Sequence, residues 1–195
     1  MIRPMPWQYD DGGRYRAGYR GETGDCVVRA VAIATAREYQ VVYDEIDAAV
    51  AAERRTAGRS SGRSSARTGL YKSTLHRYMR DVLRWTWTPT MGIGTGCRVH
   101  LRQGELPTRG PLIVDLSQHV AAVIDGVVYD ASDPVRGGNR CVYGYWQPGR
   151  DGVGRGRQGD RRLRHTGYVR GMPSVPASTP LPVPEIRARG GEARH

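Results

Sequence analysis

The sequence predicts an α+β fold in which helices come first and an antiparallel sheet follows. Two observations carry this prediction. Apolar residues recur at helical spacing through the first part of the chain, and after Trp85 the period changes from 3.6 towards 2. The chain has 195 residues, of which 38% are hydrophobic, which suffices for one compact domain but not for two.

Three helices are expected, at residues 26–37, 41–54 and 70–84, each with one apolar stripe. We expect the carboxylate of Asp25 to cap the first helix by accepting an early backbone N–H. Between the second and third helices, residues 55–69 form a Ser/Gly/Arg-rich stretch with nothing to bury. This stretch is therefore predicted to be a mobile surface loop.

Five strands follow in the expected order 85–90, 111–117, 119–124, 127–130 and 141–146. Asp125 and Gly126 form a two-residue hairpin turn between the third and fourth of these strands, because Gly accepts the positive φ that such turns need. We divide the chain into an irregular lead-in at 1–21, a domain at 22–147, and a disordered tail rich in Arg, Gly and Pro at 148–195.

The net charge of +11 invites a nucleic-acid partner, because clustered cations bind phosphate by releasing counterions. Lys72 is the single lysine, so the many arginines also fit a coding bias that has nothing to do with phosphate. Residues 147–195 hold ten arginines and four acids, which places much of the excess charge in the tail. A basic arm that contacts nucleic acid or an acidic partner is therefore the alternative function for this chain.

The geometry of the predicted hairpin identifies two aspartates that could contact His119. If Asp125 and Gly126 form the turn, the side chains of His119 and Asp130 are diagonal neighbours on one side of the ribbon. An Asp in that position can hold the imidazole in one tautomer and stabilise its charged form. Asp133 is the alternative partner, although Pro134 indicates that the strand has ended by then.

Cys26 stands at the start of the first predicted helix, where the positive end of the helix dipole favours a thiolate. A neighbouring imidazolium strengthens this effect. The first backbone N–H groups of the helix lack internal partners, and one of them can donate to the oxyanion formed when a thiolate attacks a carbonyl. The sequence therefore predicts a nucleophile at Cys26, a base at His119 and an orienting acid at Asp130.

The segments "DCVVRAVAIAT" and "HVAAVIDGVVYDASDP" resemble the papain-like cysteine peptidase superfamily, in particular C39-like peptidases and small papain-like proteins of bacteria and phages. The resemblance covers roughly residues 20–146. It implies N-terminal helices that carry the Cys, packed on a C-terminal sheet that carries His and Asp. It also implies a triad of Cys26, His119 and Asp130, and the "DP" of the family hairpin would match Asp133 and Pro134.

The chain departs from this family at the oxyanion hole. Papain-like enzymes usually place a Gln upstream of the nucleophile, and that position here is Arg20. Thr23 and Arg20 are therefore the candidates for the second oxyanion donor.

Three cysteines without paired spacing argue against a disulfide framework and for a reducing compartment, so the cytoplasm is the expected location. A zinc site built from Cys97, His100 and Cys141 is a weaker alternative, because no second ligand pair is visible. His76 is expected at the surface, and the tryptophans are expected in the core. No membrane segment, secretory signal, metal or organic cofactor is expected.

The sequence thus predicts a cysteine hydrolase that cleaves peptide or isopeptide bonds, with amidase, deamidase and transferase chemistry open to the same residues. The expected partner is a protein or peptide substrate, and the basic tail would favour an acidic one.

Overall fold

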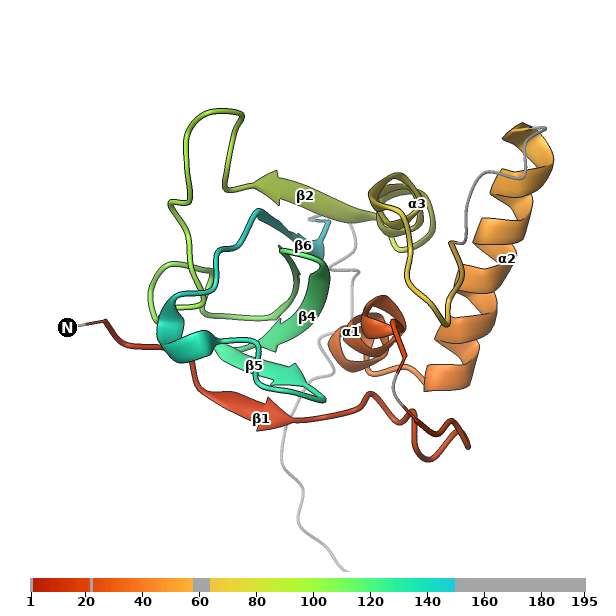
Figure 1. Ribbon diagram of the computed structural model, residues 1–195, viewed down its shortest axis with the longest axis horizontal. Coiled ribbons are helices and arrows are strands. Elements are labelled where there is room, and N and C mark those ends of the chain that lie inside the picture. The colour runs from red at the N-terminus through yellow and green to blue at the C-terminus, as the bar shows by residue number, and fades with distance from the viewer. Residues whose placement is uncertain (1, 22, 58–63, 150–195) are drawn as a thin grey trace, which may run out of the picture. The chain divides into compact units, whose positions relative to one another are not determined.

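The computed structural model describes residues 2–21, 23–57 and 64–149. Within this part of the chain the fold is α+β, as predicted, with the helices on one face of a six-stranded sheet (Figure 1). The helices are α1 (Cys26–Thr35), α2 (Tyr39–Ala57) and α3 (Lys72–Arg77), and α3 continues into a π-helical turn at Tyr78–Val82. The strands are β1 (Trp7–Tyr9), β2 (Trp85–Pro89), β3 (Pro111–Leu116), β4 (His119–Ile124), β5 (Val127–Asp130) and β6 (Gly144–Pro148).

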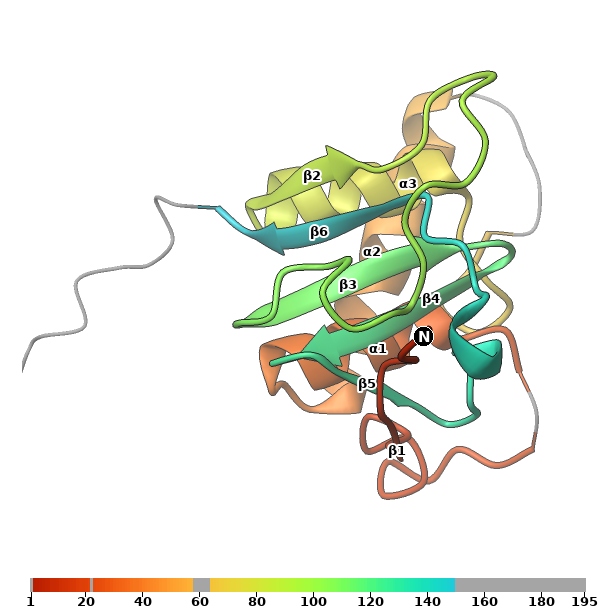
Figure 2. The same cartoon turned by 90° about the vertical axis from the view of Figure 1, so that its left-hand side faces the viewer.

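The spatial order of the strands is β1-β5-β4-β3-β6-β2, and Figure 2 shows the strands side by side in front of the helices. Neighbouring strands are antiparallel except that β1 runs parallel to β5. The sheet is therefore mixed, whereas a purely antiparallel sheet was predicted. The sequence pattern does not predict β1, because its three residues are exposed and carry no periodic signal. β1 forms because the edge of β5 offers it hydrogen-bonding partners.

Strand alternation places a hydrophobic cluster on each face of the central strands. On the helix side, Ile113, Val120 and Ala122 pack against α1 in one cluster. On the other side, Leu112, Val114, Ala121 and Val123 belong to a second cluster, which also contains residues of the loops that follow β2 and β5. Both faces of the central strands are therefore buried, which fixes the register of the strand that carries His119.

The β4–β5 hairpin has the predicted register. Ile124 pairs with Val127, and the two turn residues Asp125 and Gly126 have φ of 49° and 80°. Positive φ at both positions is the geometry of the tight turn that suits the twist of an antiparallel pair.

The segment predicted as a mobile loop at 55–69 is largely ordered where the structure describes it. Helix α2 extends to Ala57, and residues 58–63 lie outside the described part. Residues 64–69 form a tight turn in which the backbones of Ser65 and Gly69 exchange two hydrogen bonds, of 3.0 and 3.2 Å. Ala66 is fully buried in the same hydrophobic cluster as α1, so an apolar side chain fixes this turn. The surrounding Ser/Gly/Arg-rich sequence gave no indication of this burial.

The cysteines also depart from expectation, because Cys97 and Cys141 form a disulfide and Cys26 is the free thiol. The two bonded cysteines are therefore not an open zinc-ligand pair, and among the described residues no cluster of three or more His, Cys, Asp or Glu could hold a metal ion.

The aromatic residues pack largely as predicted. Trp85 and Trp146 are buried, but His76 lies edge-on against Trp87 and Trp146 instead of at the surface. This burial lowers the pKa of His76.

None of the helices in the described ranges is both long and apolar enough to cross a membrane. The predicted tail lies almost wholly outside the described residues, which end at Gly149.

Candidate active site

Helix α1 presents Cys26 at its first position. The helix packs on β3 and β4 through its buried side chains, which are Val27, Val28, Ala30, Val31, Ala32 and Ala34. The helix ends at Thr35, and the next residue, Ala36, adopts the left-handed conformation with φ of 52°. Because so much of α1 is buried, the position of its first residue is fixed by packing. The free thiol of Cys26 is half-buried at the edge of this core.

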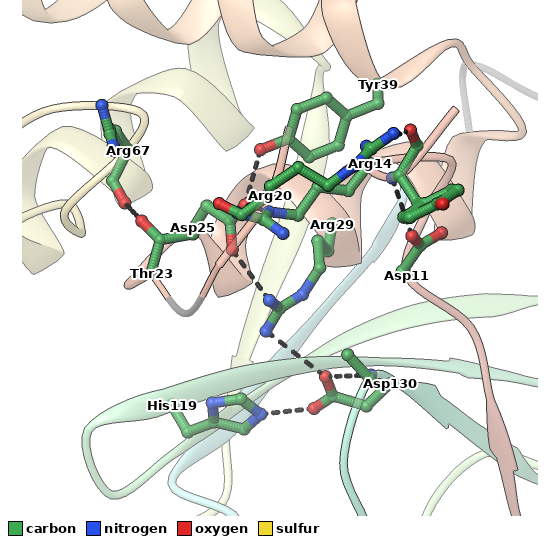
Figure 3. Close-up of polar contacts among 12 residues, drawn as sticks. Asp11, Arg14, Arg20, Thr23, Asp25, Arg29, Tyr39, Arg67, His119 and Asp130 are labelled. Carbon is green, nitrogen blue, oxygen red and sulfur yellow. Dashed lines mark hydrogen bonds and ion pairs between the residues drawn. The ribbon is translucent and has the colours of Figure 1, made fainter. Parts of the chain in front are cut away.

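His119 and Asp130 come together where β4 and β5 diverge. The β4–β5 pairing ends at Ala122 and Tyr129, so both residues lie beyond the paired part of the ladder. The His119 ring nitrogen Nε2 makes a short hydrogen bond to Asp130 Oδ2 (Figure 3). Asp130 is only 3% exposed, and its other oxygen accepts the Ala131 N–H at 2.7 Å. The carboxylate is therefore held on both oxygens while it orients the imidazole.

The Cys26 side chain lies close enough to His119 to affect the charge of the imidazole, which places the third predicted residue next to this pair. Burial disfavours the charged imidazolium, but the hydrogen bond with Asp130 and the nearby Cys26 side chain outweigh it and raise the pKa of His119 to about 9. His119 therefore keeps its second proton at neutral pH. Since Nε2 is bound to Asp130, Nδ1 is the nitrogen that can serve Cys26.

Asp25 does not cap α1 with its side chain, contrary to the prediction. Its carboxylate is 1% exposed and instead accepts hydrogen bonds from Arg14 Nε at 2.7 Å, Arg29 Nη1 at 2.8 Å and the Tyr39 hydroxyl. Two of these donors are guanidinium groups, and pairing with two positive charges is favoured over a capping bond to a neutral backbone N–H, which explains why the cap is not formed. The first-turn N–H groups of α1 are consequently left without a carboxylate partner from Asp25.

Arg29 connects this buried carboxylate to the predicted triad. Its Nη1 binds Asp25, and its Nη2 lies 3.6 Å from Asp130 Oδ1. Figure 3 shows the resulting chain from Asp25 through Arg29 and Asp130 to His119. Arg29 was not among the residues predicted for the site, although an arginine in an otherwise apolar helix, four residues after an aspartate, indicates a buried ion pair.

The remaining sequence candidates lie in other contacts. Thr23 Oγ1 donates to the backbone oxygen of Arg67. Arg20 donates to the Tyr15 and Tyr19 carbonyls at 2.8 and 3.1 Å and stacks on the Tyr15 ring. Neither side chain is directed to Cys26 by these bonds. The Cys26 backbone N–H lies at the start of α1, where backbone N–H groups have no acceptor within the helix.

Asp133 lies in the loop that follows β5. Its Oδ1 accepts the Val135 N–H at 2.8 Å, which is the local bond expected of an aspartate in a turn. Between the two aspartates that the sequence left open, the structure thus brings Asp130 to the imidazole.

A cavity of about 840 Å³ lies along the other half of α1 and is separate from this site. It is lined by residues of the lead-in, by Ala32, Ile33 and Ala36, and by the start of α2. Cys26, His119 and Asp130 do not line it.

Comparison of the chain with protein family models, with curated proteins and with solved structures gave no match to any of them.

Proposed function

We propose that the protein is a cysteine hydrolase of the papain-like type, with Cys26 as nucleophile, His119 as acid and base, and Asp130 as the orienting residue. The observation that carries the proposal is the convergence of a free thiol on the first turn of a buried helix with an imidazole paired to a buried carboxylate. Three residues that are unremarkable alone form a chemically ordered set together.

In the proposed reaction the Cys26 thiolate attacks a carbonyl carbon while His119 holds the proton. The tetrahedral oxyanion accepts a hydrogen bond from the Cys26 backbone N–H. His119 then donates its proton from Nδ1 to the leaving group, and an acyl group remains on the sulfur. His119 next takes a proton from water, which attacks the acyl carbonyl and frees the thiolate.

Peptide and isopeptide bonds are the proposed substrates, and amides and thioesters fit the same chemistry. The tail's arginines favour an acidic protein or peptide, since ten of them stand in residues 147–195.

Alkylation by iodoacetamide tests the nucleophile directly. In the disulfide-bonded protein Cys26 is the free thiol, so its labelling can be followed without interference from Cys97 and Cys141. At pH 7 we expect Cys26 to react at least about tenfold faster than a free cysteine thiol, because the imidazolium of His119 favours the thiolate. Incubation with activated peptide esters should also add the acyl group to Cys26, as read by mass spectrometry.

His119→Ala should remove the fast labelling, and His76→Ala should leave it unchanged. His76 is a suitable control because it is another partly buried histidine that packs on tryptophans and not on the thiol. Equal labelling rates in wild type and His119→Ala, or the absence of any acyl-Cys26 species across peptide, amide and thioester substrates, would contradict the proposal.

The alternative, a basic protein that contacts nucleic acid, rests on the tail's arginines. Binding that is steeply weakened by salt and lost on deletion of residues 148–195, in a protein whose Cys26 labels no faster than a free thiol, would favour this alternative.

A further inference from the structure

A second group of reactive side chains lies at the disulfide. Cys97 is exposed and Cys141 is half-buried. His100 Nε2 lies 3.4 Å from Cys97 Sγ, and His100 Nδ1 lies 3.2 Å from Glu105 Oε2. A sulfur, an imidazole and a carboxylate therefore stand in a row at the surface.

Glu105 contacts both the backbone and the ring of His100 and so fixes the position of the ring. Burial opposes ionisation of Glu105, but hydrogen bonds from the backbone and ring of His100 lower its pKa, so the group is a carboxylate at neutral pH. The His100 backbone N–H donates to Oε2 at 2.7 Å, and Arg102 lies 3.4 Å from Oε1. Glu105 thus keeps the His100 ring beside Cys97, where Nε2 can donate a hydrogen bond to a thiolate once the disulfide opens.

The two cysteines are also held together independently of their covalent bond. The Leu101 N–H donates to the Arg140 oxygen at 3.0 Å, and the Val142 N–H donates to the Val99 oxygen at 2.8 Å. Leu101 and Val142 are fully buried in the same hydrophobic cluster. Opening the disulfide therefore leaves both sulfurs on neighbouring, anchored backbones, from which the bond can form again.

We propose that Cys97 and Cys141 form a reversible thiol–disulfide exchange site for a dithiol partner, with Cys97 as the exchanging sulfur and Cys141 as the resolving one. This inference goes beyond the proposed hydrolase and does not depend on it. The exposed side of the bond is Cys97, which makes it the sulfur that an incoming thiolate reaches.

The exchange proceeds in two balanced steps. A thiolate of the dithiol attacks Cys97 Sγ, the bond to Cys141 breaks, and Cys141 leaves with the electron pair and takes a proton. The second thiol of the partner, as thiolate, then attacks the mixed disulfide and releases Cys97 as a thiolate beside His100. The partner becomes a disulfide, and the protein gains two reduced cysteines. His100 stabilises the product of the second step and so favours the reduced state.

The test uses the full chain with Cys26→Ser, so that the remaining thiols are those of the exchange pair and the outcome is independent of hydrolase activity. The folded Cys26→Ser protein is equilibrated at pH 7 with mixtures of reduced and oxidised dithiothreitol. The reduced fraction is then trapped by alkylation and measured by mass spectrometry. We expect the native disulfide to open reversibly. We also expect His100→Gln and His100→Ala to shift the equilibrium constant about five- to tenfold towards the disulfide.

Arg98→Ala is the matched control, because Arg98 is an exposed cationic neighbour on the same segment and should change the constant less than about twofold. Circular dichroism of each variant and of the reduced protein checks that the fold persists. An equilibrium constant unchanged in both His100 variants would overturn the proposal. A disulfide that stays closed in excess dithiothreitol until the protein unfolds would overturn it as well.

Discussion

Asp130 governs the proton on His119 through one short hydrogen bond, and its burial keeps water from competing for that bond. We expect Asp130→Asn to slow iodoacetamide labelling of Cys26 about tenfold or more at pH 7, because a neutral amide no longer favours the imidazolium. Asp133→Asn is the matched control. Its side chain bonds to the Val135 N–H in a turn, so labelling should stay within about twofold of wild type. Equal slowing of the labelling by the two substitutions would contradict the proposed role of Asp130 as the partner of His119.

Arg29 is the cation that two buried carboxylates share, Asp25 at 1% exposure and Asp130 at 3%. Arg29→Gln should lower the free energy of unfolding by about 3 kcal/mol, because two buried carboxylates each lose one of their positively charged partners and keep only Arg14 or His119. Arg37→Gln is the control. Arg37 pairs with Glu45 at the surface, where both side chains are about a third exposed, and its loss should cost no more than about 1 kcal/mol. Urea unfolding of both variants measures these losses. A similar loss of free energy of unfolding in the two variants would show that the Arg29 ion pairs stabilise the protein no more than a surface pair does.

At the scale of elements, the β4–β5 hairpin could be predicted from sequence because its signal is local. Asp125 and Gly126 specify the turn, and the turn specifies the register that brings His119 near Asp130. Strand β1 could not be predicted, since it exists through pairing with a strand far along the chain. The turn at residues 64–69 was missed for the same reason, because its order comes from Ala66 entering a core built by other elements.

The approach of that turn to the start of α1 depends on Gly24. A Cβ on Gly24 would lie 2.6 Å from the Thr68 carbonyl oxygen, closer than any real contact, and a backbone atom cannot swing aside. Gly24→Ala should therefore destabilise the protein by about 1–3 kcal/mol and slow the labelling of Cys26, which is two residues away. Gly92→Ala is the control, because an added Cβ there meets only the exposed Thr95 side chain, at 3.3 Å. Thermal unfolding and labelling rates of the two variants measure both effects, and a silent Gly24→Ala would mean that the two segments are not tightly apposed.

At the scale of the whole molecule, the site could be anticipated because its three residues sit at positions that secondary structure itself dictates: a helix start, a strand start and a strand end. What sequence alone could not supply were the long-range partners. The disulfide between Cys97 and Cys141 joins positions 44 residues apart, and this spacing matches no pattern that predicts a disulfide. The ion pairs of Asp25 likewise depend on which side chains the fold buries beside it, so a local capping rule gave the wrong partner.

The stability of the whole protein should depend on pH through His119. Its pKa is about 9 in the folded protein and about 6.5 when unfolded, so the folded state binds the proton more tightly. The resulting stabilisation is fully present below about pH 6.5, shrinks as pH rises, and is lost above about pH 9. By linkage it amounts to roughly 3 kcal/mol at pH 6 and under about 0.5 kcal/mol at pH 9.

Urea unfolding of the disulfide-bonded protein at pH 6 and pH 9, with His119→Gln as the reference, isolates this contribution. Other titrating groups act in both proteins, whereas the His119 contribution exists in wild type alone. The wild type should therefore lose about 2–3 kcal/mol more than His119→Gln between the two pH values. If both proteins lose the same free energy, His119 does not hold its proton in the folded state. The imidazolium on which the proposed chemistry of Cys26 depends would then be absent at neutral pH.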